Sequence, residues 1–95
     1  MSESKIERAL VQGVKERNGM CLKFVSPGLS GVPDRIVLTP DGRVYFVELK
    51  ADRGRVAAIQ RYVISEMQRR KADVRVLKGL DEVQSFLGEV FRREV

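Results

Sequence analysis

The chain has 95 residues, of which 43% are hydrophobic and 33% charged, and its formal net charge is +5. This length predicts one domain over residues 1–95, and a domain so short buries only about 60–65% of the surface that its unfolded chain exposes. The composition excludes a disordered or repeat protein, and the lack of histidine excludes Ser-His-Asp catalysis, Cys-His catalysis and His-based zinc sites.

The first predicted element is a helix over residues 4–17, which Asn18-Gly19 ends. Its apolar stripe consists of Ile6, Leu10 and Val14. The N-terminus MSESKIERAL lacks the apolar stretch of a signal peptide, and no apolar run in the chain is long enough for a membrane span. We therefore expect a cytoplasmic protein.

A short strand, Met20–Val25, and the loop SPGLSGVP are predicted next. Cys21 lies inside the apolar run MCLKFV, which favours a buried thiol over a disulfide. The runs 35–38 and 43–50 then form a hairpin, because Pro40-Asp41-Gly42 supplies the residues that a tight turn needs.

The second half of the chain continues with the basic turn DRGR, a helix over residues 56–71, a strand over 74–77 and a last helix from Leu80 to the end. The element order is αβββαβα. A three-stranded antiparallel part, extended through a crossover helix to a fourth strand, predicts an α/β fold with a four-stranded mixed sheet flanked by helices.

The hairpin brings two acidic residues together. If Thr39 pairs with Arg43, Asp34 stands opposite Glu48, and a slip of one residue places it opposite Val47 instead. Opposed carboxylates on an apolar hairpin repel each other unless a cation lies between them. Alternation along the strand places Lys50 on the same face as Glu48. The alternative is a plain Glu48–Lys50 ion pair, with Asp34 capping the loop.

These residue types suit a divalent metal. Mg²⁺ and Mn²⁺ prefer carboxylate, carbonyl and water oxygens, and Mg²⁺ takes only one or two protein carboxylates. Such an ion makes a nearby water easier to deprotonate, and the ammonium group of Lys50 is placed to position that water for attack on a phosphodiester. The pattern therefore favours phosphodiester hydrolysis.

The ordered set of Pro33-Asp34 and Glu48-Leu49-Lys50 resembles the signature of the restriction-endonuclease-like nucleases, whose αβββαβ core is similar to the predicted order. The stretches SGVPDRIVL, VYFVELKADRGRV and IQRY resemble the VRR-NUC family of virus-type replication-repair nucleases more closely. The similarity extends from Glu7 to about Leu77. It implies a small stand-alone member with an additional C-terminal helix, encoded by a bacterial host or a phage.

The resemblance implies roles for individual residues. Asp34, Glu48 and the backbone carbonyl of Leu49 would bind Mg²⁺ or Mn²⁺, Lys50 would act on the attacking water, and Gln60 and Glu7 would complete the site. Glu7 also fits a capping box that begins at Ser4, which needs no metal. Outside the family pattern, Gln60 reads as a solvent-facing helix residue.

The positive charge predicts a polyanionic partner, because clustered Lys and Arg release counterions from phosphates. Residues 50–61 hold four basic side chains and one acid, Asp52. The residues that we expect to bind nucleic acid are Arg53, Arg55 and Arg61, with Ser26 and Ser30 of the loop. The alternatives are a merely basic surface and, for the loop, a simple linker.

We therefore expect a metal-dependent, structure-selective DNA endonuclease that acts as a homodimer on four-way or other branched junctions. Two alternatives are a flap, nick or duplex nuclease of the same family and a non-catalytic nucleic-acid-binding module. Apolar residues of the last helix are either the dimer interface or part of the core. They are Val83, Phe86, Leu87, Val90 and Phe91.

Overall fold

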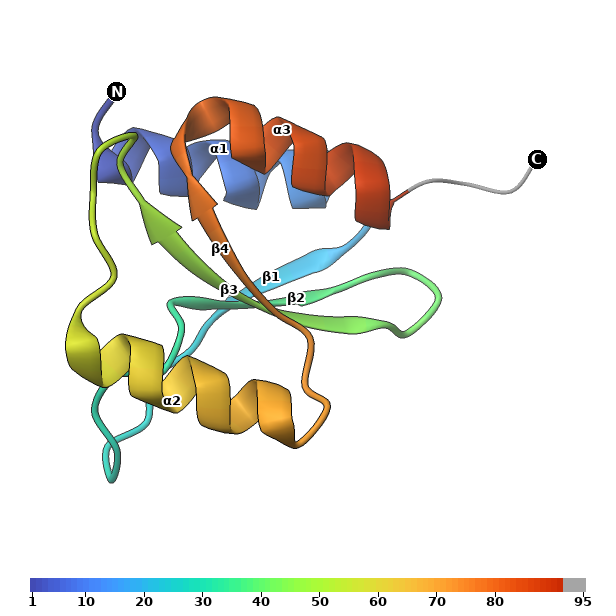
Figure 1. Ribbon diagram of the computed structural model, residues 1–95. Coiled ribbons are helices and arrows are strands. Elements are labelled where there is room, and N and C mark those ends of the chain that lie inside the picture. Colours follow the sequence, from blue (N-terminus) through green and yellow to red (C-terminus); the bar gives the residue numbers. More distant parts are fainter. Residues whose placement is uncertain (92–95) are drawn as a thin grey trace.

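The computed structural model describes residues 1–91 as an α/β fold in three layers (Figure 1). In chain order the elements are α1 (Glu3–Glu16), β1 (Met20–Lys23), β2 (Arg35–Leu38), β3 (Val44–Lys50), α2 (Ala58–Arg69), β4 (Val74–Lys78) and α3 (Gly79–Val90). This is the predicted αβββαβα order. No helix among the described residues combines the length and hydropathy of a membrane span.

The four strands form one sheet in the order β1-β2-β3-β4. β1 pairs with β2 and β2 with β3 in antiparallel fashion, whereas β3 and β4 are parallel and joined through α2. The predicted mixed sheet is therefore confirmed. Its register follows from the hairpin turn, where Thr39 N donates to Arg43 O over 3.0 Å and Gly42 takes a φ of 88° that favours glycine.

The main core lies between the sheet and the pair α1 and α3, while α2 covers the opposite face (Figure 1). Strand residues that point to the core alternate with residues that point toward the α2 side. The buried apolar side chains of this core come from α1, the sheet and α3: Ile6, Leu10, Val14, Val37, Tyr45, Val47, Leu49, Leu77, Val83, Phe86, Leu87, Val90 and Phe91.

This packing decides between the two readings of the last helix. The apolar residues of α3 and the adjoining Phe91 are buried against α1 and the sheet. They are therefore core, and are not free for an interface between copies of the chain. The predicted extension of this helix over residues 92–95 lies outside the described part of the chain.

The start of α1 differs from the prediction. The N-cap is Ser2, whose side-chain oxygen accepts a hydrogen bond from the Lys5 amide over 3.3 Å, so the helix begins before Ser4. Ser2 and Ser4 stand two positions apart and offer two possible caps, and the local sequence does not rank them. The capping box from Ser4 to Glu7 is therefore wrong.

Candidate active site

The hairpin register places Asp34 beside Glu48. Arg35 is the partner of Val47, and one further step along both strands sets Asp34 opposite Glu48, as the turn predicts. Asp34 directly precedes β2, where its Oδ2 accepts a hydrogen bond from the Leu49 backbone amide over 2.9 Å. This hydrogen bond holds the Asp34 carboxylate at the end of β3, the strand that carries Glu48.

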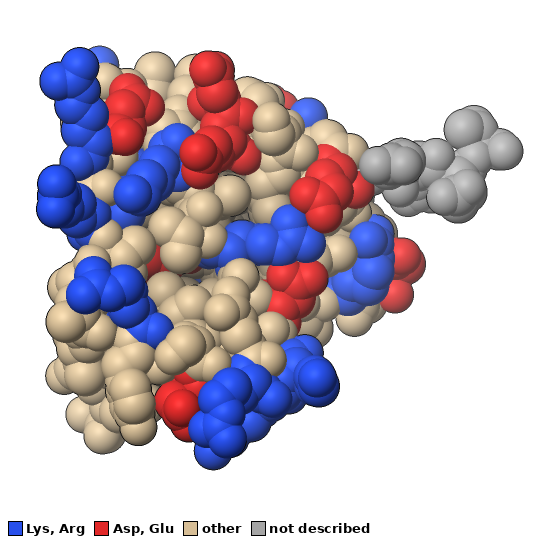
Figure 2. All heavy atoms as spheres, in the orientation of Figure 1, with Lys and Arg blue, Asp and Glu red and all other residues tan. Residues whose placement is uncertain are grey.

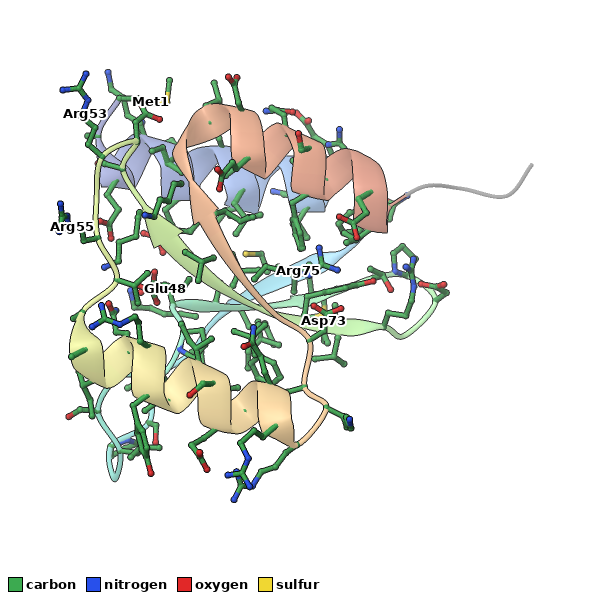
Figure 3. All side chains as sticks on the ribbon, viewed as in Figure 1. Met1, Glu48, Arg53, Arg55, Asp73 and Arg75 are labelled. Carbon is green, nitrogen blue, oxygen red and sulfur yellow. The ribbon has the colours of Figure 1, made fainter. Side chains whose placement is uncertain are left out.

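Glu48 is buried on the sheet face that α2 covers, and its side chain is only 1% exposed (Figure 3). One oxygen, Oε2, accepts a hydrogen bond from Gln60 Nε2 over 2.7 Å and lies 3.2 Å from Lys50 Nζ. The other oxygen, Oε1, is buried and has no hydrogen-bond partner among the described residues. A buried acceptor without a partner is costly, so this oxygen is available to a further ligand such as a metal ion.

The surroundings of Glu48 raise the pKa of its carboxyl group. Burial is the largest cause, because it penalises the charged form, and the nearby Asp34 carboxylate adds to it. The hydrogen bond and positive charge of Lys50, together with the hydrogen bond of Gln60, oppose this increase without cancelling it. A cation between the two carboxylates would relieve both causes and hold Glu48 ionised.

The donors at this point fit a hard divalent cation. Two carboxylates on neighbouring strands, one with a spare buried oxygen, are the oxygen ligands that Mg²⁺ and Mn²⁺ prefer. A plain ion pair of Glu48 with Lys50 is also present, but it uses Oε2 alone and leaves Oε1 unsatisfied. The ion pair by itself therefore does not explain the burial of this carboxylate.

Gln60 is part of the site rather than a solvent-facing helix residue. Its Oε1 accepts a hydrogen bond from the Ala57 amide at the start of α2 over 2.9 Å, while its Nε2 donates to Glu48. One side chain thus caps the helix and orients the buried carboxylate. The link is possible because the crossover brings α2 back over β3.

Glu7 lies apart from the two carboxylates. Its Oε2 accepts a hydrogen bond from Arg35 Nε over 2.8 Å, and the two side chains form an ion pair. Within residues 1–91 no group of three or more acidic or thiol side chains is close enough to hold a metal. The structure therefore gives Glu7 a different partner, and its role at a metal stays a prediction.

The arginines predicted to bind nucleic acid follow the strand that carries Glu48. Arg53 and Arg55 extend from the connection between β3 and α2, at one edge of the molecule (Figure 3), and Arg61 follows on α2. Figure 2 shows basic side chains gathered along the same edge. Ser26 and Ser30 lie in the β1–β2 loop, and their contact with nucleic acid stays a prediction.

Lys78 is a basic neighbour of the site that the sequence reading missed. It ends β4 and is the register partner of Lys50, so the two lysines stand side by side at the same end of the sheet. No local motif marks Lys78. Only the parallel register of β3 with β4 brings Lys78 next to Lys50, and this register depends on long-range pairing.

The profile of the VRR-NUC domain matches residues 1–81 of the chain. A structure described as a VRR_NUC domain superimposes with a TM-score of 0.86, at 24% identity, over 93% of this chain and 96% of that one, and shows the same fold.

The protein named "Putative nuclease p44" of Acyrthosiphon pisum secondary endosymbiont phage 1 is 53% identical over 49 residues, which are 52% of this chain and 53% of the phage protein. The match thus spans about half the length of this relative, and its phage origin agrees with the expected source. Because the domain profile covers most of the chain, from the α1 segment through the start of α3, we conclude that the chain belongs to the VRR-NUC domain family.

Proposed function

We propose that this chain is a nuclease that hydrolyses phosphodiester bonds of DNA with Mg²⁺ or Mn²⁺ held by Asp34, Glu48 and the carbonyl of Leu49. The observation that carries the proposal is the buried Glu48 Oε1, which has no partner among the described residues and stands across the hairpin from Asp34. Membership of the VRR-NUC family and the name of the phage relative support the same activity.

Each residue of the site has a separate role in hydrolysis. A divalent ion, when bound, stabilises charge on the phosphoryl and leaving oxygens and activates water. Lys50 keeps its ammonium group beside Glu48, where it orients a water molecule for attack on phosphorus. Gln60 fixes the Glu48 carboxylate, so that its free oxygen keeps one direction. Arg55 and Arg61 attract the phosphates on either side of the cleaved bond.

For the substrate, we propose branched DNA, with a four-way junction cut by a homodimer. A two-fold dimer presents two equivalent sites to two strands of such a junction. Self-association also buries further apolar area, which a domain of this size needs.

The test is a cleavage assay on labelled four-way junction, flap, nicked duplex and intact duplex, each with Mg²⁺, with Mn²⁺ and with chelator. We expect metal-dependent, symmetric cuts in the junction. Lys50→Ala should lower the rate by about 100-fold or more while junction binding persists, because the ammonium group that positions the attacking water is lost. Arg17→Ala, on the far end of α1, serves as the control and should cut normally.

The outcomes separate the candidates. If the chain cuts only flaps, nicks or intact duplex, the junction proposal is wrong, but the proposed metal site stands. Binding without cutting under every metal condition would favour a non-catalytic module. Full activity of Glu48→Gln would show that the residues of the site are wrongly assigned.

A further inference from the structure

A groove of about 1000 Å³ runs between α2 and the outer strand β4. Its walls carry three cationic side chains, Arg55, Arg61 and Lys78, and none of the described residues that line it is acidic. The remaining lining residues are mostly apolar or uncharged: Val56, Ala58, Tyr62, Ile64, Ser65, Gln68 and Val76.

The groove lies next to β3, the strand that carries Glu48 and Lys50 of the candidate active site. In the parallel pairing of β3 with β4, Glu48 is next to Val76 and Lys50 is next to Lys78. Residues paired in this way share a face of the sheet, so Val76 and Lys78 continue the face that carries the acidic site. Arg61 is held at the wall, because its Nη1 donates to the Val56 carbonyl over 2.7 Å. A DNA strand bound at Glu48 would therefore have the groove beside it.

The chemistry of the walls favours an unpaired strand over a duplex. A duplex presents phosphates on its outside and needs an open basic face, whereas this groove adds apolar walls that only exposed bases can contact. Tyr62 lies at the groove with 62% of its surface exposed, which leaves its ring open to a stacked base. Cations along a groove with an aromatic ring are typical of sites for single-stranded nucleic acid.

We propose that the groove between α2 and β4 binds a single-stranded stretch of DNA that continues from the cleaved bond, with Lys78 and Arg61 on its phosphates and Tyr62 stacked on a base. This inference rests on the proposed function, since the groove serves the same site. It implies that the branched substrate has unpaired nucleotides beside the cleaved bond, which a fully paired duplex lacks. Arg55 lies where the strand enters.

The test measures binding in EDTA, where no metal-dependent cutting takes place. The probes are a fluorescent oligothymidylate of about eight nucleotides and a blunt duplex, both followed by anisotropy. Lys78→Ala should weaken oligothymidylate binding about threefold to tenfold and lower the salt slope of log K by about 0.7. Tyr62→Ala should weaken it about fivefold or more, and Tyr62→Phe should restore it, because phenylalanine keeps the stacking face.

Lys15→Ala, on the exposed face of α1, is the matched control and should bind both probes as the wild type does. Duplex binding should change less than twofold in Tyr62→Ala. The inference is overturned if neither variant loses oligothymidylate affinity, or if duplex affinity falls equally. Cleavage is measured separately from these affinities. If the chain cuts DNA but both groove variants bind oligothymidylate as the wild type does, this inference alone is refuted.

Discussion

At the scale of single residues, the two oxygens of Glu48 differ in their hydrogen bonding. Oε2 is satisfied by Gln60 and Lys50, and Oε1 is buried without a partner among residues 1–91. A carboxylate kept only for stability would be expected to have both oxygens satisfied, since leaving one unpaired costs about 1–3 kcal/mol. A divalent cation bound to Oε1 would supply the partner that this oxygen lacks among the described residues.

This leads to a prediction on metal binding and stability. Adding Mn²⁺ should raise the melting temperature of the wild-type chain, because a ligand at 100 times its Kd contributes about 2.7 kcal/mol. Glu48→Gln and Asp34→Asn should lose this shift, since each removes a charged ligand. Differential scanning calorimetry with and without Mn²⁺ is the measurement.

The control for this prediction is Glu66→Gln, which changes a half-buried glutamate that pairs with Arg69 and Arg70 on α2. It should keep the full Mn²⁺ shift. An equal shift in all variants, or none in the wild type, would contradict a site at Asp34 and Glu48.

Cys21 gives a prediction on pH. Burial raises the pKa of its thiol from 9.0 to about 11, with Arg35 opposing and Glu7 adding to the shift. The folded state therefore favours the protonated thiol, so its contribution to the free energy of unfolding is complete below pH 9 and is lost as the pH rises towards 11. Alkylation by iodoacetamide, followed by mass spectrometry, should be slow at pH 8 in the native chain and fast in urea. Equal rates in both conditions would show an exposed thiol.

At the scale of elements, local patterns predicted the order of helices and strands. Apolar spacing identified the helices, and the turn Pro40-Asp41-Gly42 set the register that opposes Asp34 and Glu48. Local sequence did not predict the pairing of Glu7 with Arg35 or the position of Lys78. Both depend on how distant elements pack, which short-range patterns do not encode.

Gly79 at the start of α3 gives a prediction on backbone strain. Its φ of 82° is unfavourable for other residues, and a Cβ there would overlap the Asp52 carboxylate. Gly79→Ala should therefore lower the free energy of unfolding by about 1–3 kcal/mol. Gly88→Ala, within the same helix and with open space around the new methyl group, should raise it by about 0.5–1 kcal/mol. Urea unfolding compares them, and equal effects would refute the assigned φ.

At the scale of the whole molecule, α2 leaves part of the sheet uncovered near the outer strand β1. Met20, Leu22 and Val44 are 56%, 39% and 45% exposed, and the register places them on the same face. An apolar face beside an unpaired strand edge is a candidate contact between two copies. Because the apolar residues of α3 are buried in the core, this face is a better candidate for the dimer interface than α3 is.

The proposed dimer is tested by Leu22→Glu. Placing a charge in this face should convert the wild-type dimer to a monomer and abolish symmetric cutting of the junction, while the fold persists. Sedimentation velocity gives the mass, and Ile59→Glu, at an exposed apolar position on α2, should leave it unchanged. A wild-type chain that is monomeric while it cuts junctions would contradict the dimer.

The proposed site requires that Asp34 and Glu48 hold one divalent ion between neighbouring strands. Anomalous diffraction from a crystal soaked in Mn²⁺ tests it most directly. We expect a manganese peak within bonding distance of Glu48 Oε1 and an Asp34 oxygen, about 2.0–2.3 Å from each. A fully soaked crystal with no peak between these carboxylates, and with Glu48 Oε1 still unpaired, would contradict it.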